Sequence, residues 1–251
     1  MCYNSAMLID THCHLHDQEF FSEKQAGEIL SRAHERGIGK IICIGTSVED
    51  SMAARDFATK HKDVYWTFGV HPEHEEHGLE TSRIDFSNSL PPIAIGEVGL
   101  DYHSEGYDRE AQIRLFNEML QLAKDNNLPL SFHVRNAFDD FFGVINNFPG
   151  IRGVVHSFTD SKKTLKRILN ETEFYVGVNG LATYSTLPTP PIERILLETD
   201  APFLTPTPFR GIINESGYIR EIAEWLSEKL ALDFPTIERE TTKNAERLFK
   251  F

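Results

Sequence analysis

The chain has few cysteines, no long apolar run and a shortage of basic residues. Its three cysteines are Cys2, Cys13 and Cys43, and no two of them have the C-x-x-C spacing. This odd, scattered set argues against a disulfide framework and fits a reducing compartment, so we expect a cytoplasmic protein. No run reaches the roughly 20 apolar residues that cross a bilayer, and the opening MCYNSAML lacks the pattern of a secretory signal. We therefore expect no contact with membranes.

The charge balance is strongly acidic. The chain carries 25 Lys and Arg against 38 Asp and Glu, a formal net charge of −13 at pH 7. This argues against a protein that coats nucleic acid, because such proteins neutralise phosphates with Lys and Arg. It is compatible with an enzyme that binds an anionic substrate at a local cationic centre, such as bound metal. With no Gly- or Ser-rich linker, we expect one domain over residues 1–251 and a monomer.

Short apolar runs alternate with longer amphipathic segments along the chain. Eight runs are apolar or β-branched at nearly every position, which predicts strands buried on both faces. These runs are 7–12, 40–46, 64–71, 93–101, 128–135, 153–158, 174–179 and 194–200. Helical spacing predicts helices at 23–37, 108–127, 160–171, 216–231 and 235–249. Asp108 is expected to cap the second helix, Gly37 to stop the first and Pro235 to lie in the first turn of the last.

Eight strands that alternate with helices predict an α/β fold, a (β/α)8 TIM barrel of regular or distorted shape. The competing arrangement is a doubly wound open sheet. No Gly-rich dinucleotide turn follows the first predicted strand, which disfavours that alternative.

Ionisable side chains gather at the C-terminal ends of the predicted strands. Barrel enzymes of this class build their active sites at that end, from several strands. The residues are Asp10, His12, His14, His71, Glu97, Asp101, His133, Arg135, His156, Glu198 and Asp200. One such histidine alone is more often structural than a ligand. Four histidines and two acids at one end of five strands indicate a shared site, since each buried charge would otherwise need its own partner.

The stretch LIDTHCHLH predicts a metal ligand set. Side chains at positions i and i+2 of a strand point to the same face, so Asp10, His12 and His14 share one face. Two imidazoles on one face can hold one divalent ion, and Glu97 and Asp200 can complete a mixed shell.

Two further histidines predict a second ion. His133 and His156 come from adjacent predicted strands and could hold it, and a carboxylate such as Glu97 could bridge the two ions. Cys13 points to the opposite face of the first strand, so we do not expect it to be a ligand.

With these residues in view, the chain resembles the TatD-type metal-dependent deoxyribonucleases, within the amidohydrolase-like barrel hydrolases. The matching motifs run almost end to end and are specific in combination: IDTHCHL, FGVHPE, IGEVGLDY, LPLSFHVR, VVHSF, LLETDAPFLTP and TTKNAERLF. The resemblance implies an eight-stranded barrel with two divalent ions, Mg²⁺, Mn²⁺ or Zn²⁺. It also implies a DNase, of the 3′–5′ exonuclease type in some members, with nucleic acid as substrate.

The resemblance also assigns roles to residues. Carried over by motif, the metal ligands are His12, His14, Glu97, His133, His156 and Asp200. The first ion takes His12 and His14 with Asp200, which is also the general base. Glu97 bridges the ions, and the remaining two imidazoles bind the second.

Four more residues receive roles from the same motifs. His71 and Arg135 match positions that contact a substrate phosphate. Asp10 and Asp101 match residues that orient ligands without touching the metal.

One segment departs from the family pattern. The family commonly carries a basic RGKRNEP segment after the TDAP motif, and here the chain reads FRGIINESG. Ile212 and Ile213 replace the Lys and Arg, and Ser216 replaces the Pro. With the acidic balance of the chain, this weakens the expectation of strong binding to long nucleic acid.

Two alternatives remain. The first keeps the barrel and the metals but hydrolyses an amide or an ester, of a small molecule or an aminoacyl-tRNA, because water activated by two metals attacks carbonyl carbon as well as phosphorus. The second is a non-catalytic metal-binding protein. The presence of every ligand and of the base counts against the second alternative.

Overall fold

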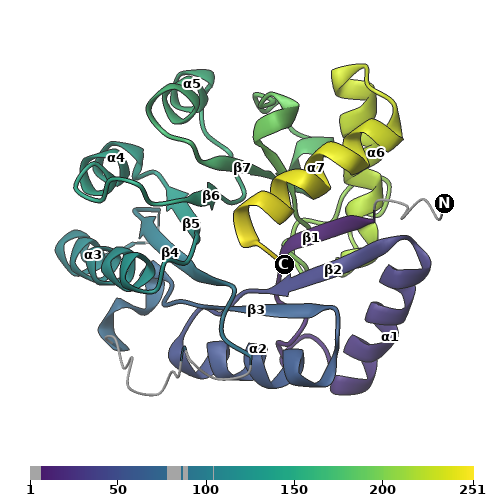
Figure 1. The fold of residues 1–251 in the computed structure, drawn as a ribbon, viewed down its shortest axis with the longest axis horizontal. Coiled ribbons are helices and arrows are strands. Elements are labelled where there is room, and N and C mark those ends of the chain that lie inside the picture. Colours follow the sequence, from purple (N-terminus) through teal and green to yellow (C-terminus); the bar gives the residue numbers. More distant parts are fainter. Residues whose placement is uncertain (1–6, 78–85, 87–89, 104) are drawn as a thin grey trace.

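The computed structural model describes residues 7–77, 86, 90–103 and 105–251, and Cys2 lies outside these residues. Eight parallel strands form one sheet in sequence order. The strands are β1 (Leu8–Cys13), β2 (Ile38–Cys43), β3 (Val64–Phe68), β4 (Ala94–Asp101), β5 (Leu130–Arg135), β6 (Gly153–Val155), β7 (Tyr175–Val178) and β8 (Ile195–Leu197). Figure 1 shows the strands around a common centre, with most of the helices outside them. The predicted (β/α)8 barrel is confirmed.

The barrel is closed between its last and first strands by individual hydrogen bonds. In the described part of the chain, regular ladders connect β1 through to β8 in order. At the seam, Thr11 Oγ1 donates to the carbonyl oxygen of Leu197 at 2.9 Å. Just beyond the strands, the Asp200 amide donates to the carbonyl of His12 at 2.8 Å and the His14 amide to that of Ala201 at 2.7 Å. These bonds tie the DTHCH and ETDA segments together.

Seven α-helices are found in the described residues. They are α1 (Glu23–Glu35), α2 (Val48–Lys60), α3 (Arg109–Asp125), α4 (Phe138–Ile145), α5 (Lys162–Glu171), α6 (Ile219–Leu230) and α7 (Phe234–Phe249). Asp108 caps α3, since its carboxylate accepts the amides of Glu110 and Ala111. Gly37 follows α1 with a φ of 87°, and Pro235 lies in the first turn of α7. The five predicted helices are confirmed, whereas α2 and α4 were not predicted.

Several strands end earlier than predicted. The runs 64–71, 153–158 and 194–200 were expected to be strand throughout, but their pairing stops at Phe68, Val155 and Leu197. Beyond β6 and β8 the backbone turns, with positive φ of 45° at Ser157 and 56° at Asp200, which an extended strand does not adopt. Several candidate site residues therefore lie in the loops that directly follow the strands.

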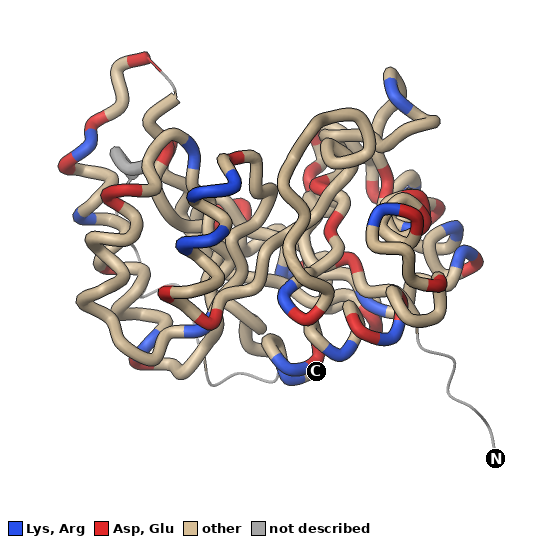
Figure 2. Tube along the Cα trace, turned by 90° about the horizontal axis from the view of Figure 1, so that it is seen from above, with Lys and Arg blue, Asp and Glu red and all other residues tan. Residues whose placement is uncertain are grey.

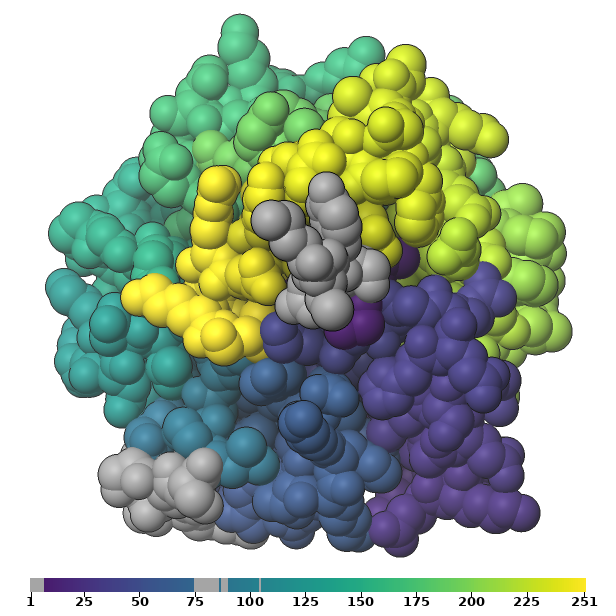
Figure 3. Space-filling model, turned by 45° about the vertical axis from the view of Figure 1, so that its right-hand side comes forward, coloured from purple at the N-terminus to yellow at the C-terminus, as the bar shows by residue number. Residues whose placement is uncertain are grey.

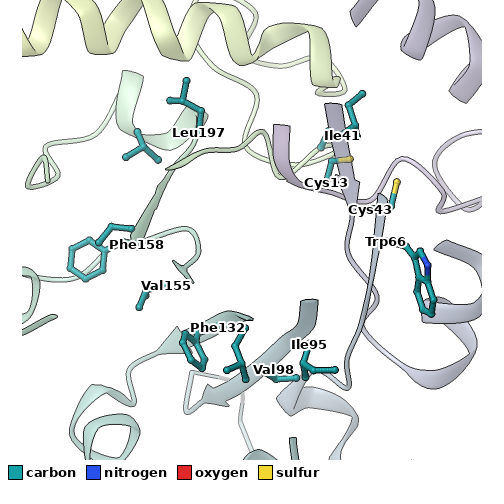
Figure 4. Close-up of a cluster of buried hydrophobic side chains, with 14 of the residues drawn as sticks. Cys13, Ile41, Cys43, Trp66, Ile95, Val98, Phe132, Val155, Phe158 and Leu197 are labelled. Atoms are coloured by element: carbon teal, nitrogen blue, oxygen red, sulfur yellow. The ribbon is translucent and has the colours of Figure 1, made fainter. Parts of the chain in front are cut away.

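Two layers of apolar side chains hold the barrel. Figure 4 shows the layer between sheet and helices, which includes Cys13, Ile41, Trp66 and Phe132. Alternate strand positions, such as Ile42 beside Ile41, belong to a second cluster with the C-terminal helix α7. This second cluster connects α7 to the site end of the barrel, where the carbonyl of its member Ile44 lies 3.2 Å from His14 Nδ1.

The C-terminal helix closes that end of the barrel. Asn244 Nδ2 of α7 donates to the carbonyls of Ile192 and Ile195 at 2.8 and 2.9 Å. Thr242 Oγ1 donates to the carbonyl of Met7, and Figure 3 shows the yellow C-terminal segment on the same face as the purple start of the described chain. The open end is therefore the one at which the strands terminate.

None of the helices in the described residues is both long and apolar enough to cross a membrane.

Candidate metal centre and active site

A cavity of about 520 Å³ opens at the C-terminal end of the strands. Of the predicted site residues, those lining it are His14, His71, Glu97, His133, Arg135, His156 and Asp200. Asp17, Asp50 and Glu73 add further carboxylates, and Arg135 is the one Lys or Arg among the described lining residues. Figure 2 shows acidic and basic residues interspersed over the rest of the chain. The cavity by itself is therefore acidic and needs cations to receive an anion.

One group of ligand atoms lies between β1, β4 and β8. His12 Nε2 is 3.5 Å from Glu97 Oε2 and 3.5 Å from Asp200 Oδ1, and His14 Nε2 is 3.6 Å from the same Asp200 oxygen. Two ligand atoms at about 2.1 Å from one tetrahedral ion lie about 3.4 Å apart, so these spacings fit a shared ion. His12 Nε2 is also buried without a hydrogen-bond partner among the described residues. The group fits a divalent cation.

A second group surrounds the other oxygen of Glu97. Glu97 Oε1 lies 2.8 Å from His133 Nδ1 and 2.7 Å from His156 Nε2. His71 Nε2 is 3.9 Å from the same oxygen. Burial lowers the pKa of His71 to about 3, so this imidazole is neutral and able to ligate. His71, Glu97 and His133 together form a candidate ligand group.

A carboxylate, that of Asp101, lies behind His133 of the second group. Asp101 Oδ2 is 2.7 Å from His133 Nε2, which leaves Nδ1 of that ring for the cavity. Gln112 fixes Asp101 by bonding both its amide and its carbonyl, at 2.9 and 3.0 Å. Such outer carboxylates set the tautomer and orientation of a ligating imidazole.

Glu198 is a site residue whose role the sequence did not reveal. It is fully buried, and its Oε1 lies 3.6 Å from His156 Nδ1 and accepts the amide of Ser157 at 2.6 Å. His12, His156 and Glu198 also form a candidate ligand group. The signal that could have identified it is its place directly after the eighth strand, two residues before Asp200.

Asp10 is separate from these groups. Its carboxylate accepts the amide and hydroxyl of Thr199 at 2.9 and 2.7 Å, and it approaches the backbone amide of His12 at 3.4 Å rather than an imidazole. Burial raises the pKa of Asp10 to about 7. The sequence placed Asp10 on one face of the strand with His12 and His14. In the structure the two histidines lie beside Asp200, whereas Asp10 joins β1 to the residue after β8 through its bonds to Thr199.

Arg135 and Asp50 lie at other parts of the cavity. Arg135 ends β5, is exposed and makes no ion pair within the described residues. Asp50, which the sequence did not single out, is 3.0 Å from Nε2 of the buried His16 and accepts the amide and hydroxyl of Thr46. Asp50 thus ties the loop after β2 to the loop after β1.

The segment that departs from the family pattern has two parts. Its retained residues are anchored: Arg210 lies over the Tyr184 ring at 3.8 Å, and Glu215 pairs with Arg32 at 2.6 Å. The replaced positions, Ile212 and Ile213, are 54 % and 58 % exposed. The loss of basic residues therefore falls on the solvent-facing part of this loop.

Comparisons with known proteins agree with this geometry. The profile described as TatD related DNase matches residues 9–250. The chain is 32 % identical to the uncharacterized metal-dependent hydrolase YabD of Bacillus subtilis, over 97 % of this chain and 99 % of that protein. It is also 32 % identical to the 3′-5′ ssDNA/RNA exonuclease TatD of Erwinia tasmaniensis, over 90 % and 94 %.

A solved structure supports the same relationship. The crystal structure of YJJV, a TatD homologue from Escherichia coli, superposes with a TM-score of 0.87 at 27 % identity and covers 98 % of this chain and 99 % of that one. The resemblance inferred from the motifs is thereby confirmed. The chain belongs to the TatD related DNase family of metal-dependent hydrolases.

Proposed function

We propose that the protein hydrolyses phosphodiester bonds of single-stranded nucleic acid from the 3′ end, with two divalent cations held by His12, His14, Glu97, His133, His156 and Asp200. The observation that carries this proposal is the position of Glu97. One carboxylate contacts the imidazoles of His12, His133 and His156 through its two oxygens, which is the arrangement a bridging ligand needs. The activity named for the Erwinia relative supports the choice of bond and direction.

The bound Mg²⁺, Mn²⁺ or Zn²⁺ ions would supply Lewis acidity toward the phosphoryl oxygens and lower the pKa of water at the site toward about 7. Asp200 is the general base of the proposal. Burial alone would raise the pKa of Asp200, but the imidazoles of His14 and His12 hold it below its usual range. Asp200 is therefore ionised at neutral pH and can accept a proton from the attacking water.

Substrate binding is assigned to Arg135 and His71. Arg135 provides a guanidinium in a cavity whose other charged lining residues are carboxylates and histidines. A guanidinium can hold a phosphate with two parallel hydrogen bonds. His71 faces Glu97 from the loop after β3 and would contact the phosphate from the side of the second ion. Asp101 keeps His133 in one orientation through its 2.7 Å contact.

A second candidate function is hydrolysis of an amide or ester bond by the same centre. The observation that favours it is the exposed pair Ile212 and Ile213, which replaces basic residues that would attract a long polyanion. The ligand set does not distinguish phosphorus from carbonyl carbon as the centre attacked.

The test is an add-back assay. Protein stripped of metal with a chelator is given Mg²⁺, Mn²⁺ or Zn²⁺ and a single-stranded DNA oligonucleotide labelled at its 5′ end, beside a panel of carboxylic esters and amides. Metal-dependent shortening from the 3′ end is the expected result. Cleavage of esters or amides alone favours the second candidate. Inactivity on the whole panel, with metal rebound, favours a non-catalytic metal-binding protein.

A further inference from the structure

An aromatic side chain stands at the mouth of the cavity with nearly half of its surface open. Phe203 lines the cavity and is 48 % exposed. Its ring centroid lies 6.3 Å from that of His14 and 5.3 Å from that of Phe20, which meets it edge-on. Phe20 is itself 40 % exposed. A pair of open aromatic rings beside a polar site is a common mark of a ligand surface.

The backbone of Phe203 is fixed by the turn that also places Asp200. The Phe203 amide donates to the carbonyl of Asp200 at 2.8 Å. Asn214, which is fully buried, donates through Nδ2 to the carbonyls of Phe203 and Thr199 at 2.6 and 2.8 Å. The backbone that carries the ring is thus held beside the proposed general base. A ligand group that packs on the ring therefore needs no ordering of this backbone.

The chemistry of the two neighbouring surfaces suits a nucleotide. In the proposed function, the cations held around Glu97 and Asp200 would receive a phosphate, and Phe203 offers a flat apolar face next to them. Aromatic rings stack on any base, so such contacts bind single strands without sequence preference. Stacking also supplies affinity that does not depend on basic residues, which matches the loss of positive charge at Ile212 and Ile213.

We propose that Phe203, supported by Phe20, is the surface on which a base at the 3′ end of the substrate stacks while the neighbouring phosphate lies in the metal centre. This proposal rests on the proposed nuclease function and adds the residue that holds the substrate's base. An alkyl amide or ester has no flat group for this surface.

The test compares two single-stranded oligonucleotides labelled at the 5′ end. One carries natural bases, and the other carries abasic tetrahydrofuran residues at its last two 3′ positions. Phe203→Leu keeps the apolar volume but removes the ring, whereas Phe203→Trp keeps an aromatic face. On the natural strand, Phe203→Leu should raise KM about 10-fold, equal to about 1.4 kcal/mol, with kcat little changed. Phe203→Trp should keep the KM of the unaltered protein.

The abasic strand and a control variant separate stacking from structure. On the abasic strand the unaltered protein should already show the raised KM, and Phe203→Leu should add nothing. Phe209→Leu is the matched control, because Phe209 lies in the same loop, stacks on Tyr218 at 4.4 Å and is not among the described residues that line the cavity. It should leave both KM values unchanged.

The outcomes that contradict the proposal are distinct. An equal loss on both strands in Phe203→Leu gives the ring a structural role and overturns the proposal. An unchanged KM on the natural strand overturns it as well, while the nuclease function stands. If the unaltered protein cleaves neither strand with any of the three ions, the nuclease function fails and the stacking proposal fails with it.

Discussion

Oε1 of Glu97 lies 2.7 Å from Nε2 of His156, and both side chains are buried. Burial alone would lower the pKa of His156 and raise that of Glu97. Each group reverses the effect on the other: the carboxylate raises the pKa of the imidazole well above its usual value, and the imidazole helps to hold the pKa of the carboxylate well below. Metal binding to such ligands displaces protons, so this pair is where a cation and protons compete.

Replacement of Glu97 by alanine should abolish metal-dependent cleavage of single-stranded DNA. The change removes the carboxylate that three histidines share, so bound metal should fall sharply as well. The fold should persist, because the apolar clusters that hold the barrel do not include this side chain. Turnover, elemental analysis of bound metal and circular dichroism check these points.

The matched control for this change is Glu118→Ala. Glu118 is an exposed carboxylate on α3, and its loss should affect neither metal content nor turnover. Near-normal activity in a folded Glu97→Ala protein would show that the assignment of the bridging ligand is wrong.

The change Glu198→Gln should weaken metal binding without removing a proposed ligand. Glu198 faces His156 Nδ1 and holds the Ser157 amide, so the amide variant loses the charge that orients this imidazole. Loss of such a partner typically lowers metal affinity about 10- to 100-fold. Competition with a chelator measures the affinity, and excess metal should restore kcat. Glu171→Gln, at the exposed end of α5, is the control; equal affinities in all three proteins contradict the prediction.

Removal of the guanidinium in Arg135→Ala should impair substrate binding and leave the metal in place. A hydrogen bond to a charged group contributes about 1.5–3 kcal/mol, so KM for the oligonucleotide should rise about 10- to 100-fold. Metal content should equal that of the unaltered protein. Arg114→Ala, on the exposed face of α3, is the control for a general loss of positive charge. A matching rise of KM in both variants would reduce the role of Arg135 to non-specific attraction.

Much of the fold and of the candidate site could be predicted from the sequence, because both depend on local patterns. Buried parallel strands are apolar along their whole length, and the site residues follow them directly. The helix α2 was missed because the buried face of this helix is formed partly by Ser51 and Ala54, which give a weak apolar pattern. The helix α4 has only eight residues, too few for a helical period to stand out.

The contacts behind the ligands could not be predicted, since they depend on how the loops turn. Glu198 reaches the Ser157 amide because the backbone there has a positive φ of 45°, and no local pattern marks that turn. Asp50 meets His16 across 34 residues of sequence. Both contacts form because two loops that are distant in sequence lie side by side in the fold. The proposed ligands, in contrast, could be found from their side-chain type and their spacing along the sequence.

The pair formed by His16 and Asp50 gives the protein a stability that depends on pH. Burial alone would lower the pKa of His16, but the Asp50 carboxylate and the Cys43 sulfur, in its thiolate form, raise it to about 10. Burial alone would raise the pKa of Asp50, but the His16 imidazolium lowers it to about 2. The contribution of Asp50 is present above its ordinary pKa of 3.8, and that of His16 is complete below 6.5 and disappears as the pH rises toward 10.

The variant Asp50→Asn should therefore be less stable than the unaltered protein by about 2 kcal/mol near pH 5, as the shift of the Asp50 pKa implies. The difference should shrink steadily from pH 6.5 toward pH 10, because the imidazolium that Asp50 pairs with loses its proton. Urea unfolding in the presence of chelator, at several pH values, measures both. Glu23→Gln, which breaks the exposed pair with Lys60, should show no such trend. A difference that stays constant with pH would mean that the two loops are joined by the Thr46 hydrogen bonds of Asp50 rather than by its charge.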